Sequence, residues 1–339
     1  MLAYSFKRLI SAIPTLFIMI AVAFFMIRIA PGGPFDTEKS VPPEIQANLE
    51  KAYHLDKPVH EQFWMYLKNL SKFDFGPSFQ YKDYTVTELI FGTNTPFADL
   101  KSNMSCRYKR LVDDSDCELL DPTGGFEVSI KLGLTAMFLA VFFGILAGTI
   151  AAINQNSHTD HATMFFAMTG ISIPNFVMAP ILILIFAVIL GWLPAGGWND
   201  GALKNMILPV IALALPQIAY ISRLTRGSMV EVLRSNFIRT ARAKGLSERA
   251  VIFKHALKPA LLPVVSYLGP ATAAILTGSV VIEQIFGVPG LGRYFVQGAL
   301  NRDYTLVVGV IVFYGALIIV FNFLVDLVYG LLDPKVRYS

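Results

Sequence analysis

The sequence predicts an all-α integral membrane protein with six transmembrane helices, and three observations lead there. The chain has 339 residues, of which 54% are hydrophobic and only 15% charged, and its mean hydropathy is +0.55. Soluble domains carry about 25% charged residues. Several apolar runs are long enough to cross a bilayer, which takes roughly 20 helical residues. Positive charges gather where the chain would return to the cytoplasm.

Six apolar runs define the predicted spans: 9–27, 132–153, 164–192, 205–222, 259–282 and 304–325. The third run lies within residues 162–199, which carry no charge. We interpret it as one long span kinked by Pro174 and Pro180, because neighbouring helices or water can satisfy a carbonyl that proline frees. A different even number of spans stays open if residues 162–199 divide.

Charge bias predicts the orientation. Residues 1–30 contain the N-terminus and the first span. Lys7 and Arg8 precede that span, and their positive charge places the N-terminus in the cytoplasm. The loop 223–258 follows the fourth span and holds nine Lys and Arg residues against Glu231 and Glu248. Spans two to six form the permease core, residues 132–334. The last two of these spans cross the membrane twice and return the tail 335–339 to the cytoplasmic side. Both termini are therefore expected to be cytoplasmic.

The polar segment 31–131 is expected outside, between spans one and two. It contains 16 Asp and Glu residues against 11 Lys and Arg residues, and we expect short amphipathic helices rather than an independent domain. Cys106 and Cys117 could pair on the oxidising side of a bacterial inner membrane. Two free thiols remain the alternative, because pairing cannot be deduced from sequence.

The basic stretch before span five predicts two short helices joined at a glycine. The first covers 237–244, with Ser235 or Asn236 as its cap, and Gly245 suits a left-handed helix end. Ser247 is expected to cap a second helix over 248–257. Pro259 then lacks a backbone donor and is expected to open the next span.

Small and basic side chains on this stretch suggest contact with a partner protein. The small side chains of Ala241 and Ala243 would let a partner approach closely. Positive charges at the edge of that contact would come from Arg239, Arg242 and Lys244. The alternative is a juxtamembrane segment that lies on anionic lipid headgroups.

The letters "RTARAKG" and the later "HAL" resemble the cytoplasmic loop of ABC importer permeases, commonly Glu-Ala-Ala, three residues, Gly, and later Ile-x-Leu-Pro. Gly245, Ala241 and Leu257 match that pattern. Arg239 replaces the Glu, Thr240 the first Ala and Lys258 the Pro, a form associated with the peptide and nickel branch. The resemblance implies that a partner ATPase binds the loop through Phe237, Ile238, Arg239, Thr240, Ala241, Arg242, Ala243, Lys244, Gly245, Leu246 and Leu257.

Other stretches extend the resemblance over nearly the whole chain. "FKRLISAIPTLFIMI", "HALKPALLPV", "GSVVIEQIFGVPGLG" and "ALNRDYTLV" resemble the B-type membrane subunits of oligopeptide permeases. The resemblance implies the type I ABC importer permease fold. It also suggests that this chain carries an insert of about thirty residues near 93–126, which resembling subunits lack.

The resemblance implies a peptide importer in the bacterial inner membrane. Its expected partners are a second permease subunit, two ATPase subunits that carry ATP and Mg, an external peptide-binding protein, the peptide and the lipid bilayer, with no nucleic acid. This chain has no Gly-x-x-x-x-Gly-Lys-[Ser/Thr] loop to cradle phosphates, so we expect no cofactor and no enzymatic activity of its own. His158, Asp160 and His161 form an incomplete metal set, and we expect solvated loop residues instead.

Polar and ionisable residues within the spans are candidates for function. Small polar side chains could line the pathway, although such residues also pack helices together: Thr169, Ser172, Asn175, Ser266 and Thr277. The ionisable side chains are Arg28, Glu283 and Asp326, for which we expect structural pairing, with Arg293 or Arg302 near Glu283, rather than proton coupling.

Three alternatives remain at this stage. The first is a permease of the same family for dipeptides, nickel or a peptide antibiotic. The second is an ion-coupled secondary transporter that uses Glu283 or Asp326. The third is a membrane receptor in which residues 31–131 bind an external ligand.

Overall fold

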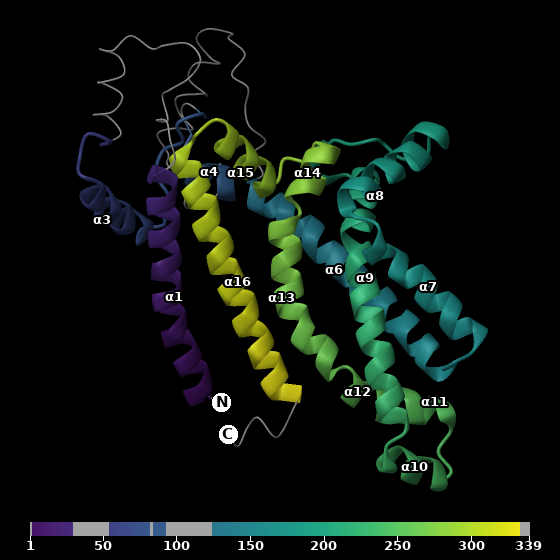
Figure 1. The fold of residues 1–339 in the computed structure, drawn as a ribbon. Coiled ribbons are helices and arrows are strands. Elements are labelled where there is room, and N and C mark those ends of the chain that lie inside the picture. Colours follow the sequence, from purple (N-terminus) through teal and green to yellow (C-terminus); the bar gives the residue numbers. More distant parts are fainter. Residues whose placement is uncertain (1, 30–53, 82–83, 93–123, 333–339) are drawn as a thin grey trace. The chain divides into compact units, whose positions relative to one another are not determined.

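The computed structural model describes residues 2–29, 54–81, 84–92 and 124–332, with only the backbone described in 2–9, 277–278 and 326–332. This part of the chain is almost entirely helical (Figure 1), and an isolated β-bridge joins Pro77 and Thr85. The elements in chain order are α1 (Leu2–Ile29), α3 (Val59–Leu70), α4 (Val86–Phe91), α6 (Gly125–Ile153), α7 (His158–Ser172), α8 (Asn175–Leu182), η1 (Ile183–Ile189), η2 (Asn199–Gly201), α9 (Leu203–Leu233), α10 (Asn236–Ala243), α11 (Glu248–Ala250), η3 (Val251–Ala256), α12 (Leu257–Ala260), α13 (Leu262–Gly278), α14 (Val280–Phe286), α15 (Leu291–Leu300) and α16 (Tyr304–Leu332). The all-α prediction is confirmed for the described residues.

These elements belong to two compact units. Unit 1 comprises Met1–Leu9, Ile130–Val288 and Leu317–Ser339, and unit 2 comprises Ile10–Ser129 and Pro289–Ala316. The helices α1, α6 and α16 each contribute residues to both units.

Helices that could cross a membrane lie close to the predicted runs. Four straight candidates are long and apolar enough: Ile10–Ile29, Gly125–Ile153, Leu203–Leu233 and Tyr304–Val325. Two bent pairs pass the same test together, His158–Ser172 with Asn175–Ile189 and Glu248–Ala260 with Leu262–Leu276. The described residues therefore contain four candidate spans, or up to six if each bent pair crosses once.

The break between α7 and α8 is much sharper than the kink we expected. The two helices meet at 105°. Ile173 adopts an extended conformation (φ −102°, ψ 118°), as the ring of a following proline requires. Pro174 then occupies the N-cap of α8, whereas Pro180 stays inside that helix without breaking it.

The start of the fifth candidate span differs from the prediction. Pro259 lies inside α12 and does not open the following helix. The break falls at Leu261, and Pro263 occupies the first turn of α13, where a missing N–H costs no hydrogen bond. The bend between the two helices is 51°. The prediction chose the wrong proline because both stand near the end of the basic stretch.

Unit 1 is held together by close contacts around α9. A Cβ added at Gly148 of α6 would lie 2.5 Å from the carbonyl oxygen of Ser222, and one at Gly170 of α7 would meet the carbonyl oxygen of Leu215. Gly144 and Gly148 form the G-x-x-x-G spacing that lets membrane helices approach closely. These glycines therefore set the distance of α6 and α7 from α9.

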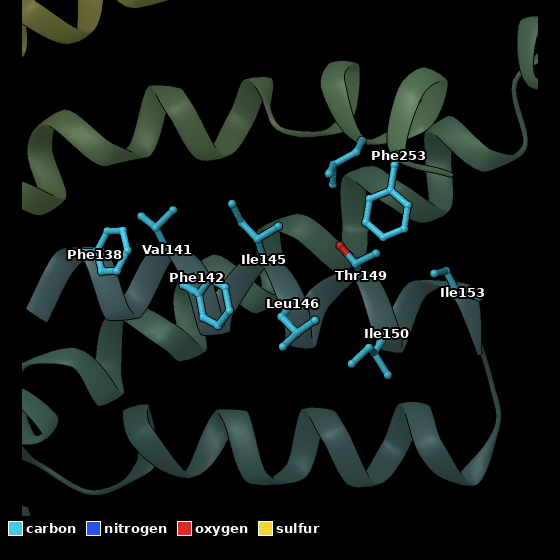
Figure 2. Close-up of a pocket in the computed structure, with 10 residues that line it drawn as sticks. Phe138, Val141, Phe142, Ile145, Leu146, Thr149, Ile150, Ile153 and Phe253 are labelled. Carbon is cyan, nitrogen blue, oxygen red and sulfur yellow. The ribbon is translucent and has the colours of Figure 1, made fainter. Parts of the chain in front are cut away.

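The opposite face of α6 presents large apolar side chains. Phe138 is 70% exposed and Phe142 57% exposed. They line an apolar pocket of about 420 Å³ together with Leu146 and with Phe253 of η3 (Figure 2). Such a lining suits membrane hydrocarbon or another apolar helix and excludes this pocket as a route for a hydrated peptide.

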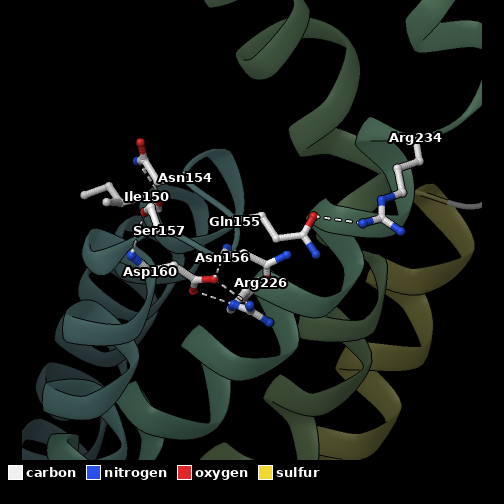
Figure 3. Close-up of polar contacts among 8 residues, drawn as sticks. All are labelled: Ile150, Asn154, Gln155, Asn156, Ser157, Asp160, Arg226 and Arg234. Carbon is white, nitrogen blue, oxygen red and sulfur yellow. Dashed lines mark hydrogen bonds and ion pairs between the residues drawn. The ribbon is translucent and has the colours of Figure 1, made fainter.

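A buried ion pair joins the start of α7 to α9 (Figure 3). Asp160 is 1% exposed and accepts two hydrogen bonds from Arg226, from Nε and from Nη2, each at 2.6 Å. The backbone N–H of Asn156 donates to the same carboxylate at 2.9 Å. The prediction that Asp160 is a solvated loop residue was wrong, because its charge is buried and paired, whereas His158 and His161 are exposed.

Unit 2 is organised around Asp303, which is fully buried. Its Oδ2 accepts hydrogen bonds from Ser78 Oγ at 2.5 Å, from the N–H of Phe79 at 2.9 Å and from the N–H of Gln80 at 3.1 Å. Its Oδ1 accepts from the N–H of Leu306 at 3.0 Å and so caps the start of α16. One carboxylate thus fixes the segment before α4 to the first turn of α16.

Aromatic contacts complete the core of unit 2. The ring of Phe313 lies edge-on to Phe91 and Phe126, with centroid distances of 5.2 Å and 4.9 Å. The ring of Phe63 on α3 lies 5.2 Å from that of Phe24 on α1.

The hydroxyl of Tyr81 donates a hydrogen bond to Gln297 Oε1. Burial raises the pKa of this phenol above its usual value.

We predict that Gly148→Ala destabilises the chain while Gly227→Ala does not. The methyl group at 148 would press on the carbonyl of Ser222, and overpacking of this kind costs about 1–3 kcal/mol. Gly227 lies on exposed α9 surface with nothing within 4 Å of an added Cβ, so alanine there gains helix propensity. The measurement is the thermal midpoint of unfolding of each full-length variant in detergent. Equal midpoints for Gly148→Ala and Gly227→Ala would show that Gly148 is not needed for close packing of α6 on α9.

We also predict that Asp160→Asn lowers the thermal midpoint. The change leaves Arg226, whose side chain is 29% exposed, without its carboxylate, and breaking a buried pair costs about 3–5 kcal/mol, less here because Arg226 reaches solvent. A double-mutant cycle with Arg226→Gln isolates the coupling between the two side chains. His161→Asn, an exposed neighbour, is the control and should leave the midpoint unchanged.

Candidate functional site

The predicted helix–glycine–helix element is present at the C-terminal end of α9 (Figure 1). The helix α10 runs from Asn236 to Ala243, within one residue of the predicted bounds. Gly245 has φ +77°, a left-handed conformation that residues with a Cβ rarely adopt. Its N–H donates to the carbonyl of Arg242 at 2.9 Å, and the N–H of Leu246 donates to that of Ala241 at 3.4 Å. The glycine turn is therefore confirmed.

The two predicted caps behave differently. Ser235 occupies the N-cap position of α10, but its hydroxyl makes no cap hydrogen bond and donates to the carbonyl of Val232 at 2.6 Å. Ser247 does cap the second helix, because its Oγ accepts from the N–H of Ala250 at 3.4 Å. The second helix continues through the π-helical segment η3 to Ala260, three residues past the predicted end.

The inner face of α10 packs on the protein itself. Ile238 is fully buried and Ala241 is 7% exposed, in one cluster with Met229 of α9 and Val251 of η3. Ala152 of α6 belongs to the same cluster. The expectation that Ala241 offers a surface to a partner was wrong: its small size lets α10 approach its own chain.

The outer face of α10 is open. Phe237 is 51% exposed, and Leu246, just after the glycine turn, is 41% exposed. Thr240, Ala243 and Lys244 are exposed too, and the hydroxyl of Thr240 donates to the carbonyl of Asn236 at 3.0 Å. The exposed surface of this turn thus combines two large apolar side chains with polar and basic ones.

An ion pair spans the glycine turn. Arg242 donates from Nε to Glu248 Oε1 at 2.8 Å and from Nη2 to Oε2 at 3.2 Å, with side chains 43% and 62% exposed. Such an exposed pair adds little stability, but its two parallel bonds orient α10 relative to α11. Arg242 is therefore paired within the chain and is not a free charge.

The element is also tied to the connection between α6 and α7. Nη2 of Arg234, at the end of α9, donates to Oε1 of Gln155 at 3.1 Å (Figure 3). The buried cluster and this hydrogen bond connect α10 and η3 to α6 and α9. A force applied to the outer face of α10 would thus act on several long helices at once.

The predicted pathway residues lie on three helices. Thr169, Ser172 and Ser266 each donate to the carbonyl four residues earlier, at 3.0, 3.1 and 3.1 Å, as hydroxyls in membrane helices commonly do. Asn175 is half-buried at the start of α8. The side chain of Thr277 lies outside the described residues. Their role in lining a pathway stays a prediction.

Glu283 and Arg28 both make hydrogen bonds within the chain. Glu283 is fully buried and accepts a hydrogen bond from Ser279 Oγ at 2.6 Å. Arg28 donates from Nε to Gln62 Oε1 at 3.0 Å, a neutral partner, so its pairing with a charged group stays a prediction. Cys106, Cys117 and the side chain of Asp326 lie outside the described residues. Sequence reasoning missed Arg226 and Gln155, although an arginine within the apolar α9 was itself a sign of a buried partner.

Comparison with known proteins places the chain among transport components. A family described as "Binding-protein-dependent transport system inner membrane component" matches residues 144–338, and its N-terminal companion matches residues 1–83. The oligopeptide transport system permease protein OppB of Escherichia coli K12 is 54% identical over 338 residues, and that of Haemophilus influenzae 52%, each alignment covering 100% of both chains. The dipeptide transport system permease protein DppB of Bacillus subtilis is 42% identical over 99% of this chain and 98% of its own.

The insert predicted near 93–126 stays a prediction. The two family matches cover residues 1–83 and 144–338, so neither of them includes it.

The matched families describe membrane components of transport systems, not enzymes. Two family matches together span most of the chain, and one of them includes the whole helix–glycine–helix element. The chain therefore belongs to the family of inner membrane components of binding-protein-dependent transport systems.

Proposed function

We propose that this chain is the permease subunit of an ATP-driven importer of oligopeptides. The observation that carries the proposal is the 54% identity, over the complete chain, with permease proteins of oligopeptide transport systems. Identity with the dipeptide permease of Bacillus subtilis is lower, at 42%, which favours oligopeptides over dipeptides.

The proposed topology has six spans with both termini in the cytoplasm of a bacterium. Four straight helices and two bent pairs supply the spans. The nine Lys and Arg residues of 223–258 favour a cytoplasmic position for α10 and α11. The segment 31–131 then faces outward, where an external binding protein would deliver peptide.

Each proposed subunit has a separate role in transport. A second permease subunit completes the pathway, and two ATPase subunits bind ATP and Mg. This chain contributes the moving helices. Alternating access of this kind needs rigid bodies and an interface with two stable arrangements.

The outer face of α10 is the proposed ATPase contact. Phe237 and Leu246 would insert into the partner, and Lys244 would add charge at the edge. The inner face, with Ile238 and Ala241 buried, would pass the motion of α10 to α9 and η3.

We predict that Phe237→Ala weakens ATPase binding while Phe253→Ala does not. Both phenylalanines are exposed, 51% and 66%, but Phe253 belongs to the apolar pocket on α6. Loss of one aromatic anchor weakens a protein interface by about tenfold or more. The measurement is the amount of ATPase recovered with affinity-tagged full-length chain after co-expression, together with uptake of a labelled pentapeptide.

Two results would contradict this assignment. One is full ATPase recovery with both Phe237→Ala and Leu246→Asp. The other is equal loss with Phe253→Ala, which would indicate a general effect on the fold. The thermal midpoint of Phe237→Ala should match that of the unaltered chain, because its side chain is half exposed and lies outside the buried cluster.

A further inference from the structure

Unit 2 contains a cavity of about 290 Å³ with an unusual set of polar groups. It is bordered by the end of α1, by α3, by the segment around Gly76 and Phe79, and by Thr305 at the start of α16. Its polar lining includes Arg28, Gln62, Tyr66 and Asn69. None of the transport roles above uses this cavity.

Arg28 is held in a fixed position at the cavity. Its Nε donates to Gln62 Oε1 at 3.0 Å, and its guanidinium carbon lies 3.5 Å from the centre of the Phe24 ring. Gln62 is itself anchored, because its Nε2 donates to the carbonyls of Leu55 at 3.2 Å and Lys57 at 2.8 Å. No carboxylate among the described residues pairs with Arg28. An oriented guanidinium that no carboxylate of the described residues neutralises is thus part of the lining.

Two buried hydroxyls in the same lining lack hydrogen-bond partners among the described residues. Tyr66 is 8% exposed, and its phenolic oxygen makes no hydrogen bond within the described residues. The buried Oγ1 of Thr305 makes none either. Burial raises the pKa of the Tyr66 phenol above its usual value, so this group is a protonated donor. Water could satisfy both hydroxyls, but water would not neutralise Arg28.

We propose that this cavity binds a phosphate oxyanion through Arg28, Tyr66 and Thr305. A guanidinium and two hydroxyl donors are the groups that phosphate recognition uses. The volume is at the lower limit for ligand sites, which admits a phosphate or a lipid headgroup and excludes an oligopeptide.

The phosphate could come from a phospholipid or from solution. Met26 and Ile29, at the same end of α1, are 67% and 80% exposed and would lie against acyl chains. This apolar surface beside Arg28 favours a phospholipid whose phosphate enters the cavity.

The test uses the full chain, delipidated in an uncharged detergent, with inorganic phosphate as the first probe. We expect phosphate to raise the thermal midpoint more than sodium chloride of equal ionic strength. Arg28→Gln should weaken the apparent affinity by about tenfold or more, because a charge-assisted hydrogen bond is lost.

Tyr66→Phe and Thr305→Val keep the test decisive if Arg28→Gln does not fold. Each removes a hydroxyl that has no partner within the part of the chain that the structure describes. The midpoint without phosphate should therefore stay the same or rise, while the phosphate-dependent increase shrinks. Lys68→Gln is the matched control. It removes one positive charge from an exposed position of α3 outside the cavity lining and should keep the full response.

Dihexanoyl phosphatidylglycerol, below its micelle concentration, is the second probe. A response at a concentration about tenfold lower than that of inorganic phosphate identifies the lipid headgroup as the source, since buried chain methylenes add affinity. Equal responses identify free phosphate. No phosphate-specific rise with either probe, or the same rise in Tyr66→Phe, Thr305→Val and Arg28→Gln, would show at most adventitious ion binding and overturn the proposal.

Discussion

A peptide group in hydrocarbon has no water to bond with, so every stretch of chain within a bilayer must satisfy its own backbone. That constraint explains why the described residues are nearly all helical. It does not explain how the helices recognise one another, because apolar surfaces on different helices are interchangeable in lipid. In unit 1 the specific contacts come from Gly148 and Gly170, which bring backbone to backbone at α9. The helix α10 then packs on α6, α9 and η3 through a separate apolar cluster around Ile238.

Charge is the second constraint, and the chain meets it with local partners. Asp160 has Arg226, Asp303 has three backbone N–H groups and a serine hydroxyl, and Glu283 has Ser279. The contacts of Asp160 and Asp303 join segments that are far apart in the sequence, whereas Ser279 lies only four residues before Glu283. Arg28 differs, because its neighbours are an amide oxygen and an aromatic ring.

Local features were predictable from sequence, and contacts between distant residues were not. Gly245 and Ser247 act through their own backbone neighbourhood, so the turn and the second cap were found. The direction in which Ala241 faces depends on Met229 and Val251, and no local rule reveals it. Asp160 and Arg226 are 66 positions apart, and neither looks unusual until α7 lies beside α9. The proline that opens α13 was misassigned for a related reason: Pro259 and Pro263 have the same chemistry, and packing decides between them.

The break before Pro174 has a geometric consequence for the surrounding bilayer. The 15 residues of α7 rise roughly 22 Å, whereas the hydrocarbon layer is roughly 30 Å thick. If α7 starts at one surface, its last turn ends at a depth where lipid tails surround the protein. Pro174 has no N–H, so the carbonyl of Gly170 loses its usual helical donor there. Gly170 is buried where α7 packs on Leu215 of α9, so protein shields this break from lipid, and the chain can end a helix at this depth only beside a neighbouring helix.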